Sequence, residues 1–160
     1  MRFSIRCIEK AHARAIVTWR YEPPYALYNL SEDEVDWLLD PANGYYSVVD
    51  GTEALAGFCC FGLDARVVGG YYRAGPPDVL DVGVGMRPDL TGQGHGSTFV
   101  TTVLAFGRER FSPAVFRVTI AAFNERSRRV FEGRGFTETR RFERPTDGLA
   151  FAQLEREARS

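Results

Sequence analysis

The stretch on which the fold depends is Val79-Leu-Asp-Val-Gly-Val-Gly-Met-Arg-Pro-Asp-Leu-Thr-Gly-Gln-Gly-His-Gly-Ser97. Apolar residues alternate in its first part, which predicts a β-strand over 79–87 that the following proline ends. Three glycines then stand at every second position, 92, 94 and 96, before a helical pattern. Backbone N–H groups point out of such a loop, and the helix dipole adds about half a positive charge. The stretch therefore predicts an anion site, where glycine lets a phosphate approach the backbone closely.

Two common phosphate-binding loops do not fit this stretch. A P-loop needs a lysine after its last glycine, and Lys10 is the only lysine of the chain. The dinucleotide fingerprint G-x-G-x-x-G needs a third glycine, but Ser97 or Phe99 stands there, and the loop follows the fourth predicted strand. The signature of zinc deaminases is absent as well. A different phosphate-bearing ligand is expected.

The remaining chain predicts the element order β-α-α-β-β-β-α-β-α-β-β. The expected strands cover 3–8, 45–49, 53–61, 79–87, 115–121, 136–142 and 149–154, and the expected helices cover 8–20, 31–39, about 94–111 and 124–135. Residues 62–77 are too rich in glycine and proline to interpret, and 66–72 fit either a strand extension or a mobile loop. The crossover between the fourth and fifth strands predicts two parallel neighbours in an otherwise antiparallel sheet.

Several short signals mark the ends of these elements. Ser31-Glu-Asp-Glu34 is a capping box, and Asp50-Gly51 predicts a two-residue hairpin turn. Asn124 is the expected N-cap of the last helix. Gly135 is expected in a left-handed conformation that ends this helix, with Phe136 against Phe131 in a Schellman motif.

Composition restricts the class of protein. A length of 160 residues fits one domain, 1–160, and 44% apolar with 13% aromatic residues indicates a globular chain. No apolar run approaches the roughly 18 residues of a membrane span, and the N-terminus lacks the apolar block of a signal peptide. Cys7, Cys59 and Cys60 predict reduced thiols in a cytoplasmic protein. Two histidines make a histidine-rich metal site improbable, so no metal is expected.

The net charge of −1 conceals an uneven distribution. No base stands between Tyr21 and Ala65, but nine acids do: Glu22, Glu32, Asp33, Glu34, Asp36, Asp40, Asp50, Glu53 and Asp64. Seven arginines crowd between Arg126 and Arg144, interleaved with glutamates. Arginine suits phosphate, but the chain is not basic overall, so nucleic-acid binding is the weaker interpretation and a solvated mixed-charge surface the simpler one.

Two motifs resemble those of the GNAT superfamily of acyl-CoA-dependent N-acyltransferases. Thr91-Gly-Gln-Gly-His-Gly96 looks like the family's Gln/Arg-x-x-Gly-x-Gly/Ala loop. Asn124-Glu-Arg-Ser-Arg-Arg-Val-Phe-Glu-Gly-Arg-Gly-Phe136 looks like its Asn-x-x-Ala/Ser-x-x-x-Tyr-x-x-x-Gly-Phe. The resemblance implies an α/β (α+β) GNAT-like fold, with a mixed, mostly antiparallel sheet of six to seven strands and four helices. It covers about 79–142 by motif and the N-terminal half only by element order.

The resemblance also implies roles for particular residues. Backbone amides from Gln93 to Ser97 would hold the pyrophosphate of acetyl-CoA, the cosubstrate. The strand edge near Val84–Met86 would bind the pantetheine amides and polarise the thioester carbonyl, and Asn124 would reach the pantetheine arm. The implied cofactor-binding residues are Val84, Met86, Thr91, Gly92, Gln93, Gly94, His95, Gly96, Ser97, Asn124 and Phe131. The alternatives are a plain glycine turn and an Asn124 that only caps its helix.

The chain departs from the family pattern at two positions. Thr91 replaces Gln or Arg, which shortens or removes one side-chain contact to phosphate. Phe131 replaces the tyrosine that protonates the leaving thiolate, and phenylalanine has no proton to give. Ser127 or a water would supply the proton, or no acid is needed because a thiolate leaves readily. Asp81 is the first candidate for the general base and Glu22 the second, while His95 is expected to neighbour the phosphates.

In this family the first helices and their loop wall the acceptor side. A wall with nine acids favours a cationic amine, such as a polyamine, an amino sugar or a peptide N-terminus, with Tyr21, Tyr25 and Tyr28 shaping the pocket. The sequence therefore predicts an N-acetyltransferase acting by direct attack. A non-catalytic acyl-CoA-binding module is the main alternative. No membrane or nucleic-acid partner is expected, and a homodimer is compatible with the sequence.

Overall fold

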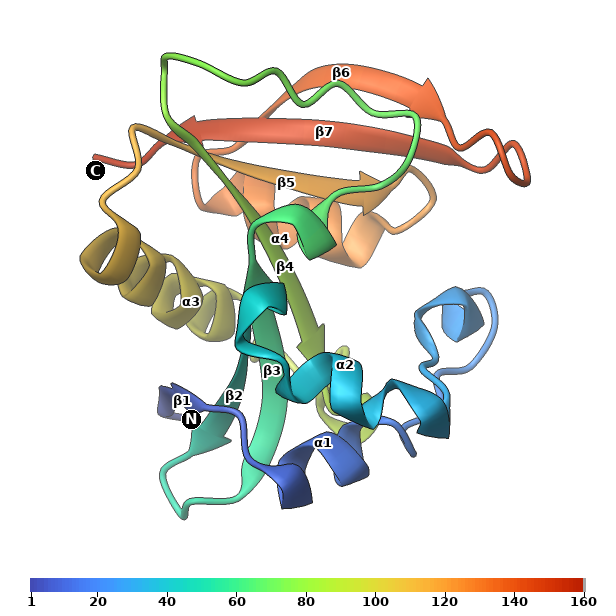
Figure 1. Ribbon diagram of the computed structural model, residues 1–160, viewed down its shortest axis with the longest axis vertical. Helices are drawn as coiled ribbons and strands as arrows, with labels where there is room; N and C mark the ends of the chain where they lie inside the picture. Colours follow the sequence, from blue (N-terminus) through green and yellow to red (C-terminus); the bar gives the residue numbers. More distant parts are fainter. Residues whose placement is uncertain (160) are drawn as a thin grey trace.

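The computed structural model describes residues 1–159, which form a seven-stranded sheet in the order β1-β2-β3-β4-β5-β7-β6 (Figure 1). The strands are β1 (Phe3–Cys7), β2 (Tyr45–Asp50), β3 (Leu55–Phe61), β4 (Val79–Met86), β5 (Val115–Ala121), β6 (Thr137–Glu143) and β7 (Ala150–Glu157). The α-helices are α1 (Lys10–Ile16), α2 (Val35–Leu39), α3 (Gly96–Phe111) and α4 (Glu125–Gly133). The expected element order and the mixed, mostly antiparallel sheet with four helices are confirmed.

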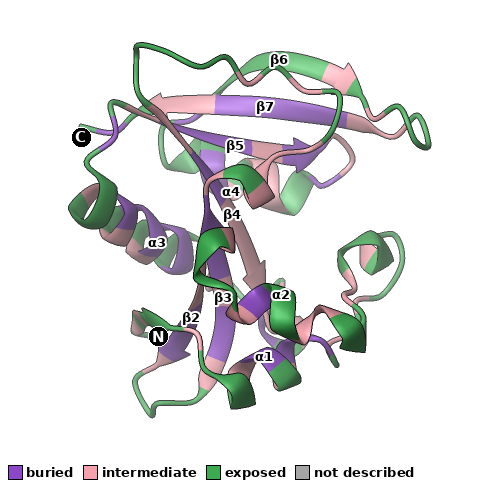
Figure 2. Ribbon diagram, viewed as in Figure 1, coloured by how far each residue is buried: buried purple, intermediate pink, exposed green. Residues whose placement is uncertain are grey.

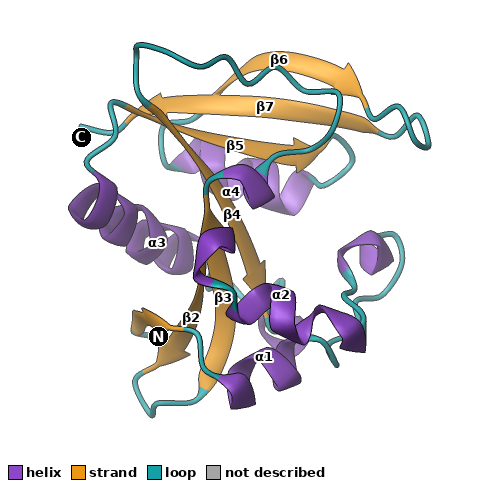
Figure 3. Cartoon of the chain, viewed as in Figure 1, coloured by secondary structure: helices purple, strands orange, loops and turns teal. Residues whose placement is uncertain are grey.

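The two halves of the sheet meet at the parallel pair β4 and β5. Their register runs only from Val79 opposite Val115 to Val82 opposite Val118. Beyond that point β4 pairs with β3 alone and β5 pairs with β7 alone. The strands diverge in Figure 3, so the sheet opens into a wedge whose sides are the C-terminal ends of β4 and β5. A parallel pair that ends early leaves backbone hydrogen-bonding groups available on both sides of the wedge.

Helices cover the two faces of the sheet. Phe99 and Val103 of α3 and Phe131 of α4 are buried in the main core, which includes the inward faces of β3, β4, β5 and β7 (Figure 2). A Cβ placed on Gly57 would lie 2.7 Å from the Phe99 ring, so the odd-numbered positions of β3 from Gly57 to Phe61 face α3. Even-numbered positions face the other side, where α1 and α2 form a second, smaller core against Phe58.

The C-terminus of α4 ends as expected. Gly135 has a φ of 92°, Phe136 N–H donates to Phe131 C=O at 3.1 Å, and Gly135 N–H donates to Glu132 C=O at 3.0 Å. The rings of Phe131 and Phe136 meet edge to face at 5.2 Å. This is the predicted Schellman motif with its apolar contact. The capping box of Ser31 and Glu34 is also present.

Two local predictions were wrong, those for the β2–β3 turn and for the end of α1, and of the two alternatives left open at 66–72 the structure has the loop. The β2–β3 turn spans 51–54 instead of two residues, because the Asp50 carboxylate accepts from Thr52 N–H at 2.8 Å and Ala54 N–H at 3.1 Å and so fixes a wider loop. Residues 66–78 form a loop and do not extend a strand. Helix α1 stops at Ile16, short of the expected Arg20. The Arg20 guanidinium instead donates to the carbonyl of Val17 at 3.0 Å, which satisfies a carbonyl just beyond the helix end.

Candidate functional site

The glycine loop lies between the end of β4 and the start of α3. Gly92 and Gly94 have φ angles of 71° and 84°, in the left-handed region that favours glycine. Residues 92–94 are exposed, and α3 begins at Gly96 with no side-chain cap at His95. The first amides of α3 therefore have no side-chain partner at the N-cap and face the loop. An uncapped helix N-terminus beside exposed glycine amides is suited to binding a phosphate group.

Arg126, in the first turn of α4, adds a positive charge beside this loop. A Cβ placed on Gly92 would lie 3.3 Å from its Nη1 atom. The guanidinium stacks on the Tyr25 ring at 4.1 Å from the centroid. The sequence indicates Arg126 only as a member of the arginine cluster. The sequence did contain a signal for a place near the glycine loop. Arg126 stands two residues after the N-cap Asn124, in the turn that follows β5, the strand next to β4.

Val84 and Met86 present backbone groups to the wedge. Arg87 N–H donates to Ala56 C=O at 2.8 Å and Asp81 C=O accepts from Gly62 N–H at 2.9 Å, so odd-numbered residues of β4 direct these groups toward β3. Alternate residues of a strand direct them the opposite way. Val84 and Met86 therefore point their N–H and C=O groups into the wedge, where the sequence predicted a strand edge for amide recognition.

The loop between α1 and α2 touches both sides of the wedge. On the β4 side, Tyr21 Oη donates to Met86 C=O at 2.6 Å. On the β5 side, Asn124 Nδ2 donates to Tyr28 Oη at 3.2 Å. Burial raises the pKa of Tyr21 to about 12, and burial raises the pKa of Tyr28 as well, although the Asn124 hydrogen bond opposes this. Both phenols therefore stay protonated near neutral pH. We call residues 21–29 the bridging loop.

Asn124 is the predicted N-cap of α4, and its contact with a pantetheine arm stays a prediction. Its Oδ1 atom accepts from Ser127 N–H at 3.1 Å, which is an N-cap, while its Nδ2 atom reaches Tyr28 at the wedge. Ser127 is half-buried in the same first turn of α4. Phe131, one further turn along, is only 1% exposed and lies in the core. The structure thus places Asn124 against the bridging loop, with Ser127 in the same turn of α4 and Phe131 in the core.

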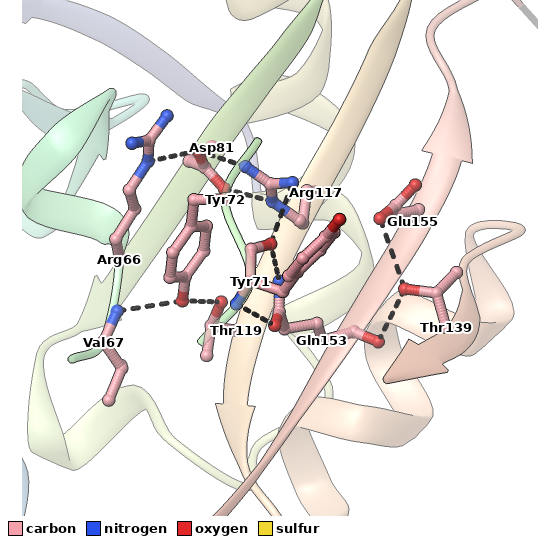
Figure 4. A network of polar contacts seen from close by, with 10 residues as sticks. All are labelled: Arg66, Val67, Tyr71, Tyr72, Asp81, Arg117, Thr119, Thr139, Gln153 and Glu155. Atoms are coloured by element: carbon pink, nitrogen blue, oxygen red, sulfur yellow. Dashed lines mark hydrogen bonds and ion pairs between the residues drawn. The ribbon is translucent and has the colours of Figure 1, made fainter. Parts of the chain in front are cut away.

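Asp81, the first candidate base, lies in a buried ion pair (Figure 4). Its carboxylate accepts from Arg117 Nε at 2.6 Å and Nη2 at 2.8 Å, and from Arg66 Nε at 2.8 Å. Asp81 is 2% exposed and Arg117 is 4% exposed. Both guanidinium groups also stack on the Tyr72 ring, at 4.7 and 5.1 Å from its centroid. A carboxylate with two cationic partners and almost no exposure is poorly placed to take a proton from a substrate.

The other predicted residues occupy the loops. Glu22 is exposed on the bridging loop, next to Tyr21. Thr91 Oγ1 donates to Pro88 C=O at 2.7 Å, so this hydroxyl is used within the turn η5 (Pro88–Leu90) that follows β4. Gln93 and Ser97 are exposed, and His95 is half-buried at the start of α3. Residues Thr91 to Ser97 therefore form one continuous segment from the end of η5 into the first turn of α3.

Two further findings concern what the described residues contain. Among residues 1–159, no three His, Cys, Asp or Glu side chains are grouped as a metal site. Within the same residues, no helix is both long and apolar enough to cross a membrane.

Comparison with known proteins gives one family and one fold. The family model "Acetyltransferase (GNAT) family" matches residues 11–136. No curated protein matches the sequence. Among solved structures, a GNAT-family acetyltransferase from Bacillus anthracis has a TM-score of 0.76 at 16% identity, over 100% of this chain and 97% of the other. A chimera of the spermidine N-acetyltransferase SpeG from Vibrio cholerae with hSSAT has a TM-score of 0.74 at 16% identity, over 99% and 96%.

Proposed function

The chain belongs to the acetyltransferase (GNAT) family, and from this premise we propose that it transfers the acetyl group of acetyl-CoA to a primary amine of a small cationic acceptor. The observation that carries the proposal is the wedge between β4 and β5, with the glycine loop at its open end. Together they offer an extended ligand a strand edge for its amides and an anion site for its phosphates.

Donor binding is assigned to backbone groups more than to side chains. Amides of residues 92–97 and the N-terminus of α3 would hold the pyrophosphate, with the Arg126 guanidinium beside Gly92 as a further cation. Val84 and Met86 would bind the pantetheine amides from the β4 side, and Asn124 from the β5 side. Thr91 is not needed for this binding, since its hydroxyl already donates to Pro88.

The proposed reaction is a direct attack without a covalent enzyme intermediate. The N–H of Val84 points into the wedge and would donate to the thioester oxygen as negative charge develops on it. One well-aligned donor of this kind contributes about 3 kcal/mol to transition-state stabilisation. Phe131 supplies no proton, so the thiolate would leave unassisted or take a proton from the first turn of α4, where Ser127 lies.

The acceptor is proposed to be cationic because of the side from which it must approach. Helix α2 lies on the face of the sheet opposite α3, and it belongs, with the bridging loop, to the segment between Tyr21 and Ala65 that holds nine acids and no base. A negative field of this kind attracts a protonated amine. A relative of similar fold is named as a spermidine N-acetyltransferase, which makes spermidine the first acceptor to test.

The test is thiol release from acetyl-CoA across a panel of amines. We expect saturable release with spermidine or an amino sugar, and little with neutral or acidic amines of similar size. Loss of charge preference, with acidic amines acetylated equally well, would contradict the cationic assignment and leave acetyl transfer standing.

A second candidate is a non-catalytic acyl-CoA-binding module. The observation that favours it is the absence of an acid at Phe131 together with the sequestered Asp81 carboxylate. Both models predict binding of acetyl-CoA. Binding without thiol release, for every amine in the panel, would select the binding module.

A further inference from the structure

Asp64 is a carboxylate held by two neutral donors. It lies in the single turn η4 (Leu63–Ala65) that follows β3. Its Oδ2 atom accepts from Trp37 Nε1 at 3.0 Å and from the hydroxyl of Tyr45. Burial raises the pKa of Tyr45, so this phenol remains a donor. The two bonds fix one oxygen of the carboxylate in place.

No cation neutralises this carboxylate. Within residues 1–159, no arginine, lysine or histidine nitrogen lies within 4.0 Å of Asp64. Other carboxylates of the chain do have an arginine partner: Glu53, Asp81, Asp89, Glu125, Glu132, Glu138 and Asp147. Binding of a cationic ligand is favourable at a half-buried carboxylate that has no cationic partner, because the ligand's charge compensates for the partial loss of hydration.

The turn that holds Asp64 packs on the face of β4 from which the acceptor would approach. Tyr45, Cys60 and Gly83 stand side by side on β2, β3 and β4. A Cβ placed on Gly83 would lie 2.7 Å from Cys60 Sγ and 3.5 Å from the Cβ of Ala65, so η4 packs directly on Gly83. Gly83 precedes Val84, the residue assigned to the thioester. The face is the one opposite α3, because Cys60 is an even-numbered position of β3.

Trp37 completes a site with the chemistry of an ammonium receptor. Its indole is 51% exposed on α2 while its Nε1 atom is bound to Asp64. An aromatic face beside a carboxylate attracts a protonated amine by cation–π and charge–charge interactions. Packing alone does not explain why this indole is exposed.

We infer that Asp64 binds the acceptor's ammonium group and is the base that takes its proton, with Trp37 and Tyr45 holding the carboxylate. This assignment rests on the proposed function, and it replaces Asp81 and Glu22 in the role of base. The ammonium gives one proton to Asp64, and the neutral amine attacks the thioester carbon. The C–S bond then breaks, the second amine proton goes to the leaving sulfur, and Asp64 releases its proton to water.

The decisive variant is Asp64→Asn, with Asp78→Asn as the matched control. Asp78 is an exposed acid just before β4 and outside the acidic segment, so its change alters net charge equally without touching η4. We expect kcat/KM for spermidine to fall at least about 100-fold in Asp64→Asn and to change less than about twofold in the control. The Kd for acetyl-CoA, measured by calorimetry, should match wild type in both.

A second variant, Trp37→Phe, keeps an aromatic ring but deletes the N–H that holds Asp64. We expect KM for spermidine to rise about tenfold with kcat less affected, because positioning of the ammonium is lost. This variant decides the matter if Asp64→Asn does not fold.

The activity of the wild-type protein distinguishes failure of the Asp64 assignment from failure of the proposed function. If wild type acetylates spermidine and Asp64→Asn retains its kcat/KM, the Asp64 assignment is overturned and the proposed function stands. If wild type releases no thiol with any amine, the proposed function fails. Asp64 is then judged by calorimetric binding of spermidine with CoA present: binding lost in Asp64→Asn supports the site, and equal or absent binding in both proteins overturns it.

Discussion

Two glycines of the loop have backbone conformations that other residues adopt at a cost. Gly92 and Gly94 have φ angles of 71° and 84°, where an L-residue loses roughly 1–2 kcal/mol. At Gly94 an added Cβ would meet no atom within 4 Å, so its substitution would impose backbone strain without a steric clash. This position therefore isolates the effect of loop conformation on ligand binding.

We expect Gly94→Ala to weaken acetyl-CoA binding about tenfold, since loss of the left-handed conformation would turn amides away from the pyrophosphate. Calorimetric titration measures the Kd. The matched control is Gly133→Ala, an exposed position of α4 where an added Cβ also has open space and φ is ordinary. Equal Kd values for Gly94→Ala and the control would contradict the assignment of the loop.

At the level of single residues, the sequence shows which side chains have suitable chemistry, but it does not show which residues they contact in the fold. The conformation of the glycine loop and the N-cap at Asn124 were predictable because both depend on contiguous residues and local spacing. Asp81 was chosen as a base from its place on the strand. Its ion pair with Arg117 joins residues 36 positions apart, which no local pattern reveals. Asp64 was one acid among nine for the same reason.

The bridging loop is the element that connects the two sides of the wedge. Tyr21 binds Met86 C=O on β4, and Tyr28 meets Asn124 on the β5 side. Tyr25 packs on Phe123 with ring centroids 5.8 Å apart and carries Arg126 on its face. The loop therefore contacts both sides of the wedge and the arginine beside the glycine loop.

We expect Tyr21→Phe to loosen this loop, because it removes a hydrogen bond that contributes about 1 kcal/mol. Amide hydrogen exchange in residues 21–29 should accelerate about fivefold, and exchange in β5 and β7 should not change. Tyr46→Phe is a suitable control, since Tyr46 packs its ring on Phe106 in the core instead. Unchanged exchange in the bridging loop would show that the Tyr21 bond does not hold it.

Elements with strong periodicity were predicted well, and connections were not. The β5 bounds of 115–121 and the α4 end signals agree with the structure, because apolar alternation and capping are local. The loop at 66–78 could not be derived. It is held by distant groups: Gln153 Oε1 accepts from Tyr71 N–H at 2.9 Å, and Tyr72 Oη lies 2.8 Å from Thr119 Oγ1. Such tertiary contacts decide the path of a segment without its own pattern.

For the molecule as a whole, charge is divided between two regions. In the arginine cluster, Arg128, Arg129, Arg141 and Arg144 are paired with nearby acids. These pairs reduce the positive field that a nucleic acid would need. Arg126 lies beside the glycine loop, whereas α2 and η4 of the acidic segment lie on the face of the sheet opposite α3. The arrangement would give the proposed anionic donor and the proposed cationic acceptor separate approaches to one strand, β4.

The central claim is that acetyl passes directly from acetyl-CoA to an amine held over β4. The measurement is mass spectrometry of acceptor and protein during turnover with isotopically labelled acetyl-CoA. We predict that the label appears on the nitrogen of a cationic amine such as spermidine, with no labelled acetyl on the protein at any time. Label that accumulates on a protein side chain before it reaches the amine, or that never reaches an amine, would contradict the account.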